Sequence, residues 1–132
     1  MSLKKANLYF GLVLFIGFLV TGYYMKEYFK PEHLDNHVVR MQIRANHIYI
    51  LFVSLLNVVS FKCELRMKSL DILFRTLILT AGVIAVIAFL KEHTGDLSVR
   101  SWTLLAVILS VASVGILLVN ELLNRVSKKN RN

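Results

Sequence analysis

The part of this chain best suited to chemistry is a row of basic and imidazole side chains between residues 37 and 47. The row consists of His37, Arg40, Arg44 and His47. Its members recur at steps of three and four residues, so they share one face of a helix. Arg44 and His47 lie within an apolar segment, where ionisable side chains are costly and mark functional sites by default, and His37 and Arg40 lie just before it. We therefore take this row, with Asn46 beside it, as the candidate binding site.

The side chains of this row indicate which ligands they suit. Arginine donates paired hydrogen bonds and fits an anionic head group, a quinone carbonyl or a haem propionate. Neutral imidazole is a common axial ligand of haem. We expect the row to face the interior of a helical bundle near its outer mouth. A second interpretation stays open, in which Arg40 and Arg44 extend to lipid phosphates and His47 bonds an Asn or Ser of a neighbouring helix.

Haem and metal sites need more ligands than this segment supplies. The other three apolar segments contain no histidine, so a second haem ligand would come from His33, His37 or His93. His33 and His37 are one helical turn apart, which is a permissible spacing for metal ligands. Chance produces such pairs often, so the sequence assigns no metal site. Haem or quinone remains the candidate cofactor.

The composition is typical of a membrane protein. Hydrophobic residues make up 56% of the 132 residues, against 45–50% in an ordinary soluble domain. The net charge of +8 comes from basic residues beside apolar runs, which favours contact with anionic lipid over binding of nucleic acid. Cys63 is the only cysteine, which excludes an intrachain disulfide.

Four apolar segments are long enough to cross a hydrocarbon layer of about 30 Å at about 1.5 Å per residue. They cover residues 6–25, 42–61, 70–90 and 101–123. The first is longer than the apolar core of a signal peptide and no A-x-A cleavage site follows it, so we interpret it as a retained span. The sequence therefore predicts an all-α integral membrane protein, with residues 1–132 forming one domain, an antiparallel bundle of four transmembrane helices.

The connections between the spans contain residues that predict where the helices begin and end. Pro31 is expected to end the first helix or restart the chain, because it lacks an N–H group. Asp35 or Asn36 is a candidate N-cap for the second helix. The short stretch 62–69 can join only antiparallel neighbours.

Small and polar residues within the spans predict how the helices pack. Gly11 and Gly22 lie close to one face of the first span, whereas Gly17 points elsewhere. Asp71 and Arg75 are four residues apart and able to pair. Two further lines allow close approach of helices. These are Ala81, Ala85 and Ala88 in the third span, and Ala106, Ser110, Ser113 and Asn120 in the fourth.

The distribution of charge predicts the orientation. Ten of the 16 Lys and Arg residues flank the side of the membrane that holds both termini. The positive-inside rule then places both termini in the cytoplasm. We expect a multi-pass protein of the cell membrane, as in a bacterial inner membrane.

Two functions from different classes remain open. The first is a non-enzymatic bundle that acts as an accessory or lipid-contacting protein, with membrane lipids as its partners and no nucleic acid. The second is a redox protein that binds haem or quinone, with His47 as ligand or hydrogen-bond partner and Arg44 as the clamp for an anion. The small-residue faces are equally consistent with packing inside one bundle, within a homo-oligomer and in a larger membrane complex.

Overall fold

The structure, a computed structural model, describes residues 2–33, 35–92 and 100–129, and most of these residues are helical. It has four long helices, α1 (Leu3–Tyr24), α3 (His37–Ser60), α4 (Lys68–Lys91) and α5 (Ser101–Lys129). A π-helical turn, η1 (Met25–Phe29), and a short helix, α2 (Lys30–Glu32), continue α1. No strand occurs in these ranges, which confirms the all-α prediction.

All four predicted spans correspond to helices that are long and apolar enough to cross a membrane. These helices cover Leu3–Phe29, His37–Ser60, Lys68–Lys91 and Ser101–Asn124. The lengths of 24 to 27 residues exceed the ~20 that a hydrocarbon core requires. Length and composition together therefore support a membrane protein.

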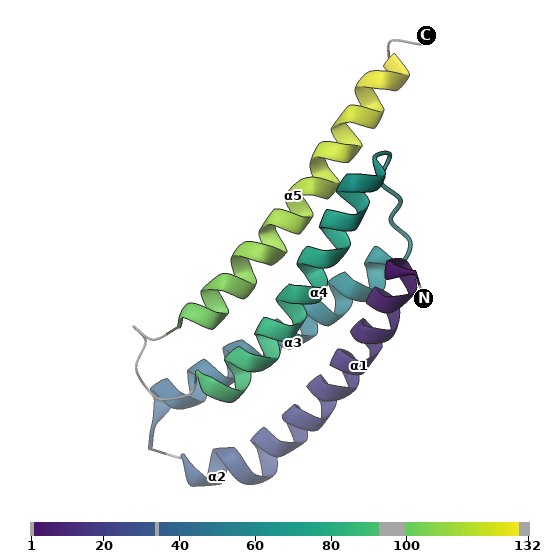
Figure 1. Ribbon diagram of the computed structural model, residues 1–132. Coiled ribbons are helices and arrows are strands. Elements are labelled where there is room, and N and C mark those ends of the chain that lie inside the picture. Colours follow the sequence, from purple (N-terminus) through teal and green to yellow (C-terminus); the bar gives the residue numbers. More distant parts are fainter. Residues whose placement is uncertain (1, 34, 93–99, 130–132) are drawn as a thin grey trace.

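Consecutive long helices run antiparallel, and α4 occupies the centre (Figure 1). Helix α4 packs against α1, α3 and α5, while α5 packs mainly against α4. The start of α1 and the connection 61–67 lie at one end of the bundle, which we call the 61–67 end. The start of α3, with η1 and α2 beside it, lies at the other end, which we call the 33–36 end.

The apolar core lies between α1, α3 and α4. Its buried members include Leu14 from α1, Phe29 from η1 and Val53 from α3. Ala81, Ala85 and Ala88 of α4 are all at most 2% exposed, which confirms the predicted small-residue line. Small side chains let the helix backbones approach closely, which gives dispersion contacts that larger side chains would block.

The glycines of α1 behave as the sequence predicted. A Cβ atom on Gly11 would lie 2.9 Å from the backbone oxygen of Ser54 on α3. A Cβ atom on Gly22 would lie 3.2 Å from Cε1 of His47, whereas Gly17 has nothing within 4 Å. Gly11 and Gly22 therefore form the face of α1 that meets α3.

The first connection is shorter than the sequence indicated. Helical structure continues through Glu32, and Pro31 lies in the first turn of α2, where a missing N–H group is tolerated. The π-helical turn before it closes with a bond from the Lys30 N–H group to the Met25 carbonyl. Asn36 caps α3, and its side chain accepts a hydrogen bond from the Val39 N–H group at 3.0 Å, as predicted for one of two candidates.

Candidate functional site

The structure places the candidate row beside the buried face of α3, not on it. His37 and Arg44 are exposed, and Arg40 and His47 are half-buried. The buried face instead carries Val39, Gln42, Ile43, Asn46, Ile50, Val53, Ser54, Asn57 and Ser60. An amide reaches a nearby carbonyl at little cost, whereas a buried guanidinium needs several partners. This difference explains why the interior takes the asparagines and leaves Arg44 outside, contrary to the expectation that the row faces inward.

Arg40 and His37 contact each other at the start of α3. The guanidinium Nη2 of Arg40 lies 2.7 Å from Nδ1 of His37. Guanidinium nitrogens only donate hydrogen bonds, so Nδ1 of His37 accepts and carries no proton. The imidazole therefore orients the Arg40 side chain without neutralising its charge.

Four cations from three elements surround a hollow at the 33–36 end, which we call the cationic groove. Lys26 and Lys30 come from η1 and α2, and Arg40 and Arg44 come from α3. Its apolar floor consists of Met25, Phe29 and Ile43, and its volume is about 240 Å³. None of the described residues that line it is acidic. The groove can therefore hold an anion above an apolar surface.

His47 occupies a packed position between α1 and α4. Its ring stacks on Phe18 with centroids 4.2 Å apart and tilts toward Phe89 at 6.5 Å. Nδ1 lies 3.0 Å from the hydroxyl of Thr21, which is also within hydrogen-bond distance of two backbone carbonyls of α1. Nε2 lies against Gly22, where an added Cβ would be 3.4 Å away. Packing holds this imidazole firmly.

An apolar cleft lies beside the packed His47. It has a volume of about 350 Å³, and its lining consists of Val20, Thr21, Tyr24, Phe29, Ile43, Phe89 and Leu90. Phe29 and Ile43 are buried at its base, whereas Val20 and Leu90 are more than 60% exposed at its rim. The cleft therefore opens from the core toward the surface that would face lipid.

Asn46 is the candidate residue that the structure ties most closely to other helices. Its amide nitrogen donates to the carbonyl oxygens of Ala88 at 3.1 Å and Glu92 at 3.2 Å. Its amide oxygen accepts from Arg100 Nη2 at 2.6 Å and from the Thr103 hydroxyl at 3.0 Å. Asn46 therefore joins α3 to the end of α4 and the start of α5.

Glu92 is a member of this network that sequence reasoning missed. The residue is 3% exposed, and its carboxylate accepts hydrogen bonds from the N–H groups of Trp102 at 2.6 Å and Thr103 at 3.0 Å. It also bonds the Thr103 hydroxyl. A carboxylate at a helix N-terminus satisfies free N–H groups and interacts favourably with the helix dipole. The only sequence signal for this role is an acidic residue directly after an apolar segment. No motif spacing indicates that its hydrogen-bond partner lies ten residues further along the chain.

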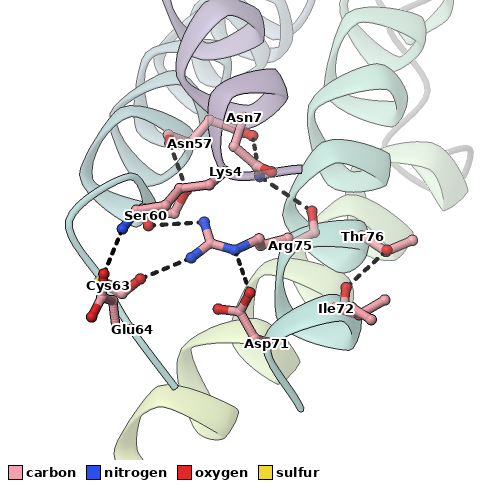
Figure 2. Close-up of polar contacts among 10 residues, drawn as sticks. All are labelled: Lys4, Asn7, Asn57, Ser60, Cys63, Glu64, Asp71, Ile72, Arg75 and Thr76. Carbon is pink, nitrogen blue, oxygen red and sulfur yellow. Dashed lines mark hydrogen bonds and ion pairs between the residues drawn. The ribbon is translucent and has the colours of Figure 1, made fainter. Parts of the chain in front are cut away.

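A second buried polar cluster, at the 61–67 end, surrounds Arg75 (Figure 2). The side chain of Arg75 is 2% exposed. It donates to Asp71 at 2.7 Å and to the carbonyl oxygens of Ser60 at 3.1 Å and Cys63 at 2.8 Å. The predicted pairing with Asp71 is confirmed, and the two carbonyl bonds hold the end of α3 against α4. Asn7 of α1 extends the cluster by donating to the carbonyl oxygen of Arg75 at 3.2 Å.

The described residues contain no group of three His, Cys, Asp or Glu side chains placed to hold a metal ion. His93 lies outside the described residues, so the structure does not place it. Comparisons with protein families, with curated proteins and with solved structures give no match to this chain. Inferences about function therefore rest on the geometry of the sites themselves.

Proposed function

We propose that this protein is a non-enzymatic, multi-pass membrane protein that acts through contact with anionic lipid, as a small accessory bundle. The cationic groove is the observation that carries the proposal. Two lysines and two arginines face one hollow at the end of the membrane-spanning helices, where lipid phosphates lie. Each Lys or Arg near an anionic surface contributes about 1 kcal/mol.

The polar groups of the interior support a structural rather than a chemical role. Asn46, Asn57 and Arg75 all bond backbone carbonyls of neighbouring helices. Such bonds fix helix positions, and in membranes they average about 0.6 kcal/mol each. The groups that could otherwise serve in transport or catalysis are thus engaged in holding the bundle together.

The orientation follows from the positive-inside rule and belongs to the same proposal. Both termini lie in the cytoplasm, so the 33–36 end and its cationic groove lie at the opposite face of the cell membrane. A bacterial inner membrane is the expected location. In that setting the groove contacts lipid head groups of the outer leaflet.

Thermal unfolding in nanodiscs tests the proposal. The discs contain phosphatidylcholine alone or phosphatidylcholine with phosphatidylglycerol. We expect the anionic lipid to raise the unfolding temperature of the wild type and to raise it much less in R40Q/R44Q, which loses about 2 kcal/mol of attraction. K5Q/K62Q removes the same charge from exposed positions outside the groove, where no hollow holds a phosphate, and should keep most of the wild-type response. An equal loss in both double variants would contradict the proposal.

The apolar cleft is the observation that supports a redox function. Its volume falls within the range of ligand sites, about 300–1,000 Å³. Thr21 lines the cleft, so a quinone in the cleft would contact Thr21, which bonds His47. Direct ligation of haem by His47 has less support, because Gly22 packs against its Nε2. An ultraviolet–visible spectrum and quinone extraction of the purified protein, repeated with His47→Ala, separate this function from lipid contact.

A further inference from the structure

The cationic groove contains two pairs of cations on two opposing walls. Lys26 and Lys30 lie four positions apart on the wall that η1 and α2 form, and Arg40 and Arg44 lie four positions apart on α3. Like charges one turn apart on a helix repel each other and destabilise it. Each wall therefore carries a repulsion that a bound anion would relieve.

The surroundings leave most of this charge uncompensated. Glu27 forms an ion pair with Lys26 at 3.2 Å, but it does not line the groove. Arg40 contacts a neutral imidazole, and Lys30 and Arg44 form no ion pair with any residue in the described ranges. The two walls thus keep a positive charge that no carboxylate of the groove offsets.

The size and floor of the groove restrict what fits. Its volume of about 240 Å³ lies below the ~300 Å³ at which sites for drug-sized ligands begin, so it suits a polar head group. The floor of Met25, Phe29 and Ile43 is apolar and continuous with the membrane-spanning helices. A ligand with an anionic head and hydrocarbon chains satisfies both surfaces.

We propose that the cationic groove binds the head group of a lipid that carries two phosphates, one against each wall. This inference rests on the proposed function, because it names the lipid class that the same groove takes. A monophosphate lipid brings one negative charge to four cations and reaches one wall. A diphosphate lipid brings two, relieves the repulsion on both walls, and receives paired hydrogen bonds from Arg40 and Arg44 and point charges from Lys26 and Lys30.

Native mass spectrometry of the detergent-solubilised protein, titrated with cardiolipin or phosphatidylglycerol, tests this inference. Phosphatidylglycerol is supplied at twice the molar concentration of cardiolipin, so that the total phosphate is equal. We expect cardiolipin to bind about thirtyfold more tightly, because its second phosphate interacts with the two cations of the second wall. K26Q/K30Q and R40Q/R44Q should each reduce cardiolipin binding to the level of phosphatidylglycerol, and K5Q/K62Q should leave it unchanged.

The outcomes separate this inference from the function on which it rests. Equal binding of the two lipids at matched phosphate would overturn the diphosphate assignment and leave lipid contact intact. Absence of binding by either lipid would overturn both. A loss confined to R40Q/R44Q, with K26Q/K30Q unaffected, would also contradict the two-wall arrangement. Circular dichroism of each variant checks that the helices are retained, as expected for substitutions of side chains that lie at the surface of the groove.

Discussion

At the scale of single residues, the structure separates charges that hold the bundle together from charges that are free to bind. Arg75 uses its Nε and both terminal nitrogens on one carboxylate and two carbonyls, and it is almost fully buried. Arg44 is exposed and forms no ion pair with a described residue. The same residue type therefore has opposite roles at the two ends of the bundle.

Arg75→Lys should show how much the geometry of the buried guanidinium contributes. Lysine keeps the charge but cannot reach all three acceptors at once, so two charge-assisted bonds are lost. We expect the free energy of unfolding to fall by at least about 3 kcal/mol. Arg66→Lys, at an exposed position, should change it by less than about 0.5 kcal/mol. Unfolding in detergent measures both, and equal effects would show that charge alone matters at position 75.

Glu64 provides a pH-dependent contact outside the spans. Its hydrogen bond with Lys4 at 2.8 Å, together with the attraction of that charge, lowers the pKa of the Glu64 carboxyl. A lowered pKa means that the ionised form is favoured in the folded state. The contact therefore adds stability at pH values above the pKa of the unfolded chain and loses it as the pH falls through the lowered pKa.

Carbon-13 NMR of the Glu64 carboxyl measures that shift directly. We expect the pKa to rise toward its ordinary value in Lys4→Gln and to stay low in Lys5→Gln, which removes a neighbouring charge that does not bond Glu64. An unchanged pKa in Lys4→Gln would mean that the ion pair does not form in solution.

The candidate residues show what a sequence can and cannot reveal about a site. Asn46 was predictable because an amide within an apolar segment needs partners, and the structure gives it four. The spacing of the row did not predict which side of α3 faces the interior of the bundle. Arg40, Arg44 and Asn46 lie within two helical turns of one another, and the packing of the neighbouring helices decides which of these side chains is buried.

At the scale of elements, the contact of α1 with α3 depends on a missing side chain. Gly11→Ala would place a Cβ 2.9 Å from the Ser54 carbonyl oxygen and 2.9 Å from the Asn57 Cβ, so the helices must separate. We expect a loss of at least about 1 kcal/mol, in the range that overpacking causes. Gly17→Ala meets nothing within 4 Å and should gain about 0.5–1 kcal/mol from helix propensity. Thermal unfolding in one detergent compares the two, and a stabilised Gly11→Ala variant would contradict the close approach.

The elements were predictable to different degrees. The apolar runs located both ends of α4 within two residues, but they missed five residues at the start of α3 and six at the end of α5, where charged residues continue the helix. The extension of the first helix through η1 and α2 was missed because polar residues and Pro31 are typical of a connection. The π-helical turn keeps the chain helical up to Pro31. Hydrophobic periodicity and helix-breaking residues do not predict such a turn.

At the scale of the whole molecule, the orientation is open to a simple test because the chain has one cysteine. Cys63 lies in the connection at the 61–67 end and is partly exposed. We expect a membrane-impermeant maleimide to leave it unlabelled in intact cells and to label it after the membrane is opened. C63S/N36C moves the thiol to the 33–36 end and should be labelled in intact cells. The reverse pattern would invert the orientation and place the groove at the cytoplasmic face.

The central claim is that the cationic groove selects anionic lipid from the membrane around it. The most direct measurement is the composition of lipids that co-purify with the protein from cell membranes in mild detergent. We expect anionic lipid to be enriched over the bulk membrane in the wild type and K5Q/K62Q, and the enrichment to disappear in R40Q/R44Q. The same lipid composition in all three, equal to that of the bulk membrane, would contradict the account.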